Sequence, residues 1–171
     1  MREIIMAFQG EMALKGLNRG TFEAKMTKAV RTRLADLGEF KLRTAQSTLY
    51  IQPLDEDIDM DEAFRRVSKV FGIARPSRPA VCEKDFAAIC QTAEDYLGKT
   101  LRGIRSFKVE AKRSDKTFPM KSPELCRELG AFLLSKHPHL RVDVHNPQLE
   151  VMVEIRDFGA YIHGPKVPGP G

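Results

Sequence analysis

The sequence predicts an α/β protein of two domains, in which short strands and amphipathic helices alternate along both halves of the chain. Residues 1–80 follow the order β-α-β-β-α-β, judged from the spacing of their apolar side chains. Residues 81–165 contain further strand and helix patterns of the same kinds. Between the halves, Arg75–Pro79 holds two prolines and two arginines in five residues, which is typical of a domain boundary.

The first half begins with an apolar run, Ile4–Phe8, that suits a strand buried on both faces. A glycine-containing loop, Gly10–Gly16, leads to a helix for which Asn18 is a suitable N-cap. Gly38 ends this helix. One apolar stripe runs along it at intervals of three or four residues: Phe22, Met26, Val30, Leu34 and Leu37.

Two strands follow, Phe40–Arg43 and Leu49–Ile51, around a tight connection at Ala45–Ser47. Asp59 and Glu62 form a capping box for a second helix, which Gly72 ends before a short strand near Ile73. This order is that of the split-βαβ, ferredoxin-like arrangement. The apolar stripe of the second helix comprises Ala63, Phe64, Val67, Val70 and Phe71.

In the second half, Asp85 caps a helix, and Phe107–Ala111 alternates as a strand does. A second helix is predicted to start at Ser122 as N-cap with Pro123 at its first position. The remaining strands are predicted in alternating segments, with a hairpin at the end: Leu140–Val144, Leu149–Ile155 and, after a turn at Asp157–Gly159, Ala160–Ile162. The tail, Gly164–Gly171, is rich in proline and glycine and is expected to be a linker.

Composition places the chain among soluble globular proteins. Hydrophobic residues make up 42% of the 171 residues and charged residues 30%. No apolar run approaches the roughly 20 residues of a membrane-spanning helix, so we expect no membrane association. Cys82, Cys90 and Cys126 form neither an even set nor a C-x-x-C pair, which disfavours a disulfide framework and a zinc site. A reducing, cytoplasmic location fits these features best.

Common catalytic signatures are missing from the sequence: it has no Walker A loop, no G-x-G-x-x-G, no G-x-S-x-G and no H-E-x-x-H. We therefore expect no catalytic residue, no cofactor and no metal site in this chain. His137 and His139 flank Pro138 at a predicted helix end, and no cysteine or carboxylate nearby completes a ligand set. Cys90 and Cys126 are expected to pack on apolar helix faces.

The net charge of +5 is a mild indication of a polyanionic partner. The basic residues are concentrated between Lys99 and Arg127, a stretch with nine basic and three acidic residues. Within that stretch, residues 111–122, called here the basic segment, follow a strand and end at a helix N-terminus. Its cations suit contacts with phosphates, and its aromatic side chain suits stacking on a base. The candidate RNA-binding residues are Lys112, Arg113, Lys116, Phe118 and Lys121.

An equally weighted alternative makes the basic segment a solvated loop whose Phe118 packs in the core. A second candidate site is the strand-to-helix loop that carries Lys15, Asn18 and Arg19. Turn geometry alone explains the glycines of this loop equally well.

Several blocks of the sequence, in one order, resemble the ThiI family of tRNA 4-thiouridine synthetases. The resemblance covers the chain from end to end. It is carried by Gly10-Glu11-x-x-Leu14-Lys15-Gly16-x-Asn18-Arg19-x-x-Phe22-Glu23, Val70–Ile73, Phe107–Glu110, Lys112-Arg113-x-Asp115-Lys116-x-Phe118-Pro119, Ser122–Glu124, Val142–Pro147, Gly159–Ile162 and Gly169–Gly171.

The resemblance implies a ferredoxin-like domain at residues 1–80 and a THUMP domain, an RNA-binding module, at residues 81–165. Residues 166–171 would begin a linker to an ATP-pyrophosphatase-type domain that is absent here. In the family, that domain uses ATP to activate a uridine of tRNA, and a cysteine desulfurase supplies the sulfur. The family's catalytic cysteines lie in the absent part.

We therefore expect this chain to be the non-catalytic, tRNA-binding portion of a tRNA sulfurtransferase that holds tRNA by its single-stranded acceptor end. A homodimer is compatible with this expectation. One alternative is a THUMP module of another RNA-modifying enzyme, such as a methyltransferase, a deaminase or a pseudouridine synthase. Another is an α/β module without an RNA role, which senses a ligand or oligomerises.

Overall fold

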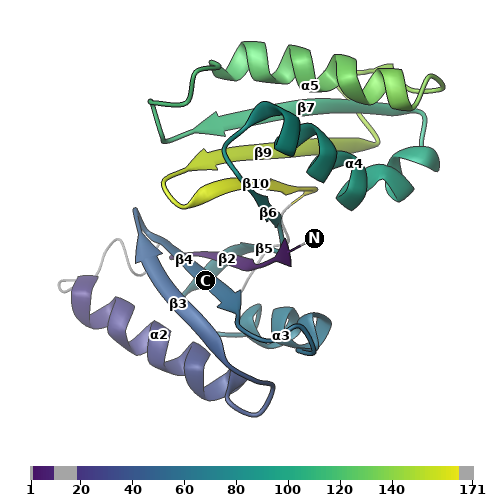
Figure 1. Cartoon of the computed structure of the whole chain (residues 1–171). Coiled ribbons are helices and arrows are strands. Elements are labelled where there is room, and N and C mark those ends of the chain that lie inside the picture. Colours follow the sequence, from purple (N-terminus) through teal and green to yellow (C-terminus); the bar gives the residue numbers. More distant parts are fainter. Residues whose placement is uncertain (1, 10–18, 166–171) are drawn as a thin grey trace. The chain divides into compact units, whose positions relative to one another are not determined.

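The computed structural model describes residues 2–9 and 19–165, which form two compact units. One unit comprises residues 3–78, and the other comprises residues 79–165 together with Arg2. Each unit consists of helices packed on a β-sheet (Figure 1). Within the described residues, no helix is both long and apolar enough to cross a membrane.

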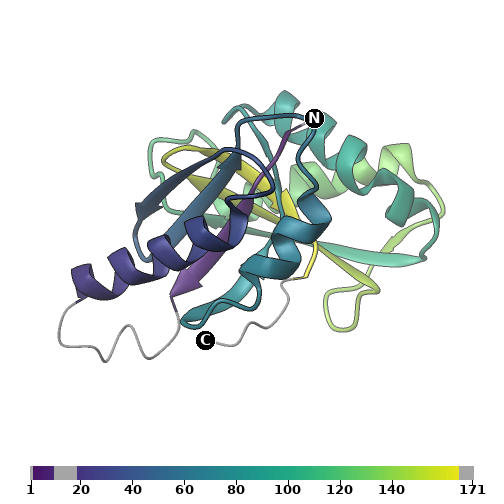
Figure 2. The ribbon, with the colours of Figure 1, turned by 90° about the horizontal axis from the view of Figure 1, so that it is seen from below.

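The first unit contains four strands and two helices in the predicted order. They are β2 (Ile5–Gln9), α2 (Arg19–Leu34), β3 (Phe40–Ala45), β4 (Thr48–Pro53), α3 (Met60–Val67) and β5 (Ile73–Ser77). The sheet order is β3-β4-β2-β5, and all of its neighbouring strands are antiparallel. Both helices lie on the same side of this sheet (Figure 1, Figure 2). The α/β class and the ferredoxin-like topology are thus confirmed.

Local signals determine the turns and caps of this unit. Gln46 and Ser47 form the two-residue turn between β3 and β4, with φ angles of 50° and 64°. Both residues therefore lie in the left-handed region that the tightest hairpin turns require. At the start of α3, the Oδ1 atom of Asp59 accepts a hydrogen bond of 3.1 Å from the amide of Glu62, as the predicted cap requires.

The apolar stripe predicted for α3 extends beyond the end of the helix. The helix ends at Val67, so Phe71 lies beyond it and is 68% exposed, whereas Val70 remains buried. Gly72, with φ of 96°, then directs the chain into β5. A Cβ atom there would lie 2.6 Å from the Phe22 ring, so only glycine fits.

The second unit contains a six-stranded sheet with two helices. Its elements are β6 (Ala80–Cys82), α4 (Phe86–Arg102), β7 (Ser106–Arg113), α5 (Ser122–Lys136), β8 (Arg141–Val142), β9 (Leu149–Arg156) and β10 (Gly159–His163), with β1 (Arg2–Glu3) at one edge. The sheet order is β1-β6-β10-β9-β7-β8. β7 is parallel to both β8 and β9, whereas β10 is antiparallel to β9 and β6.

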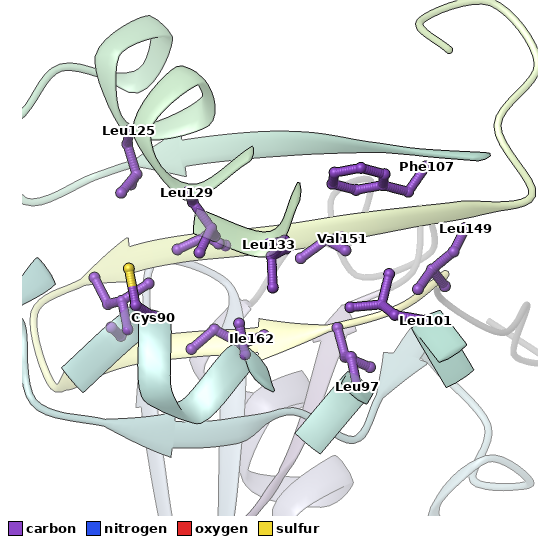
Figure 3. Close-up of a cluster of buried hydrophobic side chains, with 14 of the residues drawn as sticks. Cys90, Leu97, Leu101, Phe107, Leu125, Leu129, Leu133, Leu149, Val151 and Ile162 are labelled. Atoms are coloured by element: carbon purple, nitrogen blue, oxygen red, sulfur yellow. The ribbon is translucent and has the colours of Figure 1, made fainter. Parts of the chain in front are cut away.

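Leucine side chains of α4 and α5 form the core of this unit together with the strands beneath them (Figure 3). The predicted cap Asp85 accepts a hydrogen bond of 3.1 Å from the amide of Ala88. The alternation along β7 places Phe107, Val109 and Ala111 toward this core, and Lys108 and Lys112 on the other face of the sheet.

Two local predictions for this unit are wrong, and one strand was not predicted. The strand expected at Leu140–Val144 is only two residues long, because Asp143 turns the chain by accepting hydrogen bonds from the amides of His145 and Asn146. The N-cap of α5 is Lys121 rather than Ser122, and no side chain caps this helix. The short strand β6 was not predicted, since its hydrogen-bonding partner β10 lies far along the sequence.

Candidate nucleic-acid interface

The basic segment connects the end of β7 to the start of α5 at one end of the sheet (Figure 1). Because β7 and β9 are parallel, their last residues lie side by side, with Arg113 opposite Ile155. The amides of Ser114 and Asp115 both donate to the carbonyl oxygen of Ile155, at 2.8 and 3.3 Å. The start of the loop is therefore fixed to the end of β9.

Asp115 organises the middle of the segment. Its Oδ2 atom accepts a hydrogen bond of 2.6 Å from Lys84 Nζ, and its Oδ1 atom accepts from the amide and the hydroxyl of Thr117 at 2.9 and 2.6 Å. These partners, Lys84 first, lower the pKa of Asp115 well below its ordinary value. Lys84 Nζ also donates to the carbonyl oxygen of Asp157, 3.1 Å away. Asp115 and Lys84 together connect the loop to the β9–β10 turn.

Arg113 holds the second half of the loop. Its Nη1 atom donates to the carbonyl oxygens of Phe118 and Met120, at 2.7 and 3.3 Å. The side chain is half-buried. It lies on the helix side of the sheet, because side chains alternate along β7 and that of Lys112 lies on the opposite face. The sequence predicts a direct contact between Arg113 and phosphate, whereas in the structure this side chain is engaged in positioning the loop.

Phe118 is not available for stacking on a base. Its side chain is 5% exposed and belongs to the core cluster beneath α5, with Leu125 and Leu129. Burying a phenyl ring removes a large apolar surface from water, and this stabilises the fold more than an exposed ring would. For this ring, the structure agrees with the alternative interpretation, in which Phe118 packs in the core.

Three lysines remain as candidates for contacts with an anion: Lys112, Lys116 and Lys121. All three are exposed, and none forms an ion pair with a residue that the structure describes. Lys116 and Lys121 lie in the loop itself, whereas Lys112 projects from the face of the sheet opposite the helices. The structure thus gathers the predicted cations at one end of the sheet, on two of its faces.

The N-terminus of α5 adds hydrogen-bond donors to this region. No side chain caps the helix, and Pro123 has no amide hydrogen, so the amides of Ser122 and Glu124 point out of the first turn. The positive end of the helix dipole favours an anion at this position. Lys121, the N-cap residue, carries its charge at the same place.

The second candidate site cannot be assessed from the structure. Lys15 and Asn18 lie outside the described residues, and Arg19 is described only as the first residue of α2, without its side chain. These three residues remain predictions.

Burial raises the pKa of each cysteine thiol, to about 11 for Cys90. A raised pKa disfavours the reactive thiolate, so none of the three has the environment of a nucleophile. Within the described part of the chain, no group of three or more histidine, cysteine or acidic side chains is arranged to hold a metal ion. His137 instead lies 2.7 Å from a carboxylate oxygen of Glu94.

Sequence reasoning did not identify Lys84 or Phe158 as part of this region. Lys84 is 31 residues from Asp115 in the chain, so no local pattern could have indicated their contact. Phe158 is 37% exposed in the turn that Lys84 binds, and is the aromatic ring that this end of the sheet presents to solvent among the described residues. Its place after the alternating strand β9 was the one signal that could have identified it.

Comparison with known proteins supports the division into two units. Residues 4–77 match the family model of the ThiI ferredoxin-like domain, and residues 83–163 match that of the THUMP domain. A probable tRNA sulfurtransferase of Alkaliphilus metalliredigens is 42% identical over 173 residues. That alignment covers 100% of this chain but 43% of the relative, so the chain spans less than half the length of such a relative.

Solved structures show the same similarity. A 4-thiouridine synthetase, crystallised as an RNA complex with bound ATP, matches with a TM-score of 0.81 and 28% identity over 99% of this chain and 42% of that one. PH1313 from Pyrococcus horikoshii matches with a TM-score of 0.84 and 25% identity, over 98% of this chain and 55% of that one.

Proposed function

The chain belongs to the ThiI family, of which it contains the ferredoxin-like and THUMP domains, and we propose that it binds tRNA for a tRNA sulfurtransferase. One observation carries the proposal: Lys116 and Lys121, which form no ion pair with a described residue, lie on a loop that Arg113, Asp115 and Lys84 hold in place. The similarity to a synthetase crystallised with RNA supports it.

In this proposal, Lys112, Lys116 and Lys121 contact phosphate groups, and the free amides at the start of α5 bind one of them. The backbone of the loop that carries Lys116 and Lys121 is held in place before RNA arrives, because it is attached to β9 and to Lys84. Preorganisation reduces the entropy lost on binding.

The ligand of the basic segment is the single-stranded acceptor end of tRNA. The major groove of an A-form helix is deep and narrow, so side chains cannot reach its base edges, whereas an unpaired end exposes faces and edges of its bases. The geometry is compatible with such an end, since Lys112, Lys116 and Lys121 lie between the last residues of β7 and the start of α5, at one end of the sheet.

Thiolation itself belongs to the parent enzyme. We propose that uridine is activated with ATP outside residues 2–165, that a cysteine desulfurase supplies the sulfur, and that the protein acts in the cytoplasm, where a homodimer is compatible with this role. The chain alone is therefore expected to bind tRNA, and neither to bind ATP nor to release pyrophosphate. The ThiI ferredoxin-like match over residues 4–77 favours this enzyme over a THUMP-containing methyltransferase, deaminase or pseudouridine synthase.

The proposal is tested by fluorescence anisotropy with labelled tRNA and the purified chain. Intact tRNA is compared with the same tRNA lacking its unpaired 3′ nucleotides, and ATP binding is measured by calorimetry. We expect tight, salt-dependent binding of intact tRNA, weaker binding of the trimmed tRNA and no ATP binding. Equal affinity for both tRNAs would refute end recognition, and no tRNA binding at all would refute the proposed function.

A further inference from the structure

A second concentration of positive charge lies at the opposite end of β7 from the basic segment. There the end of α4 lies near the start of β7 (Figure 1), and β8 pairs with the first residues of β7. A surface cavity of about 510 Å³ opens between these elements. It is called the arginine cavity here, and its lining residues are Arg102, Gly103, Ile104, Arg105, His139 and Arg141.

The backbone that carries two of these arginines is fixed by hydrogen bonds. The Oε1 atom of Gln148 accepts from the amides of Arg105 and Ser106, at 2.7 and 3.2 Å. The amide of Arg141 donates to the carbonyl oxygen of Arg105 at 2.9 Å, so Arg105, immediately before β7, lies beside Arg141 at the start of β8. Arg102 approaches from the last turn of α4.

The positive charge of the cavity is largely uncompensated. Arg102 and Arg105 form no ion pair with a described residue. Arg141 lies 3.4 Å from Asp143, but its side chain is still 71% exposed. The carboxylate of Asp143 is engaged by the amides of His145 and Asn146, and these hydrogen bonds lower its pKa. Among the described residues, one carboxylate therefore forms an ion pair with one of the three guanidinium groups of the cavity.

His139 completes the wall and is held by a hydrogen bond to α4. Its Nε2 atom lies 3.0 Å from the carbonyl oxygen of Leu101, and it donates there because a carbonyl oxygen can only accept. The Oε2 atom of the nearby Glu94 carboxylate lies 2.7 Å from His137, and Glu94 forms no ion pair with the arginines of the cavity.

We propose that the arginine cavity binds backbone phosphate groups of the same RNA molecule that the basic segment holds. Guanidinium groups bind phosphate oxygens in a planar, two-pronged geometry, and several of them around a hollow concentrate the positive potential there. The inference rests on the proposed function and extends it by a second site.

The spacing of the two sites determines which part of the RNA each one contacts. β7 runs from one site to the other: Lys112 is seven residues after Arg105, and at about 3.3 Å per residue their Cα atoms lie roughly 23 Å apart. A stacked strand rises about 3.4 Å per nucleotide, so the few unpaired nucleotides held at the basic segment span less than this distance. The arginine cavity therefore contacts the paired part of the RNA, where it recognises phosphates and not bases.

The test compares the chain with the double variant Arg105→Gln/Arg141→Gln by anisotropy over a range of KCl concentrations. We expect tRNA affinity to fall about tenfold, and the slope of log affinity against log salt to decrease by about one for each phosphate that the variant no longer binds. A three-nucleotide strand with the sequence of the tRNA 3′ end should bind both proteins equally. Arg127→Gln, which changes an exposed arginine of α5 outside the cavity, is the matched control.

Each contradicting result has a distinct meaning. If the wild-type chain binds tRNA and the double variant binds it with the same affinity and salt slope, the inference is wrong and the proposed function stands. If the wild-type chain does not bind tRNA, both are wrong. If inorganic tripolyphosphate shifts the amide resonances of Gly103 and Arg105 while the double variant binds tRNA normally, the cavity holds small oligophosphates and the inference is again wrong.

Discussion

Two cationic regions of this protein use their charge in opposite ways. In the ferredoxin-like domain, Arg66 contacts Asp36 at 2.6 Å and Glu62 at 2.8 Å, and Arg65 contacts Glu62 at 2.5 Å. These arginines lower the pKa of Glu62 to about 2. In the basic segment of the THUMP domain, the lysines described above have no such partners among the described residues.

The difference shows why the number of basic residues alone does not locate an interface. Surface ion pairs satisfy their charges internally, so an incoming phosphate would have to displace a carboxylate first. Arg78, which contacts Glu3 and Asp61, belongs to the same satisfied class. Unpaired cations on a fixed loop can bind a phosphate without that cost.

The largest effect is expected from the anchor of the basic segment. Phe118→Ala should reduce the free energy of unfolding of the THUMP domain by about 3–5 kcal/mol, because it leaves a cavity in the core. Urea denaturation measures the change. Phe71→Ala, which removes an exposed ring from the other domain, is the control and should change stability little. Equal effects of the two substitutions would mean that Phe118 does not anchor the loop.

The comparison becomes sharper when each cationic region is neutralised separately. Lys112→Ala, Lys116→Ala and Lys121→Ala combined should weaken tRNA binding about 100-fold, at about 1 kcal/mol for each phosphate contact. The salt slope should decrease by about three. Arg65→Ala combined with Arg66→Ala should change neither quantity, because these arginines are already paired. Anisotropy titrations decide, and equal losses from both sets would invalidate the distinction.

Substitutions of Arg113 distinguish a role in positioning the loop from direct contact with phosphate. Arg113→Lys removes the hydrogen bonds to the carbonyl oxygens of Phe118 and Met120 and keeps the charge, so the free energy of unfolding should decrease by about 1–3 kcal/mol. tRNA affinity should decrease with it while the salt slope stays unchanged. If Arg113→Lys binds as the wild type does and Arg113→Ala has a lower slope, Arg113 contacts phosphate directly.

The smallest expected effect is on the stability of the fold at acidic pH. The pKa of Asp115 is lowered in the folded protein, mainly by Lys84, so the carboxylate stabilises the fold above its ordinary pKa of about 3.9. This contribution is lost as the pH falls below about 4. The urea midpoint of the wild type should therefore decrease over that range more steeply than that of Lys84→Met. Lys116→Met is the control, and it should follow the wild type.

Local sequence signals predicted most of the fold. The caps at Asp59 and Asp85 depend on hydrogen bonds to amides three residues away, and the apolar stripes of the helices depend on spacing within a few turns. Such contacts lie within one element, so the sequence contains both partners in a short window. β6 was missed for the opposite reason, since its pairing with β10 joins Val81 to Tyr161.

For the candidate site, the sequence by itself determined where the cations are and that a helix begins beside them. Only the tertiary structure decided that Phe118 points into the core, that Arg113 holds its own loop and that Lys84 reaches Asp115. It also decided that Arg102, Arg105 and Arg141 surround one cavity. Each of these outcomes depends on partners from separate strands and helices, and the distance between such partners exists only after the sheet has formed.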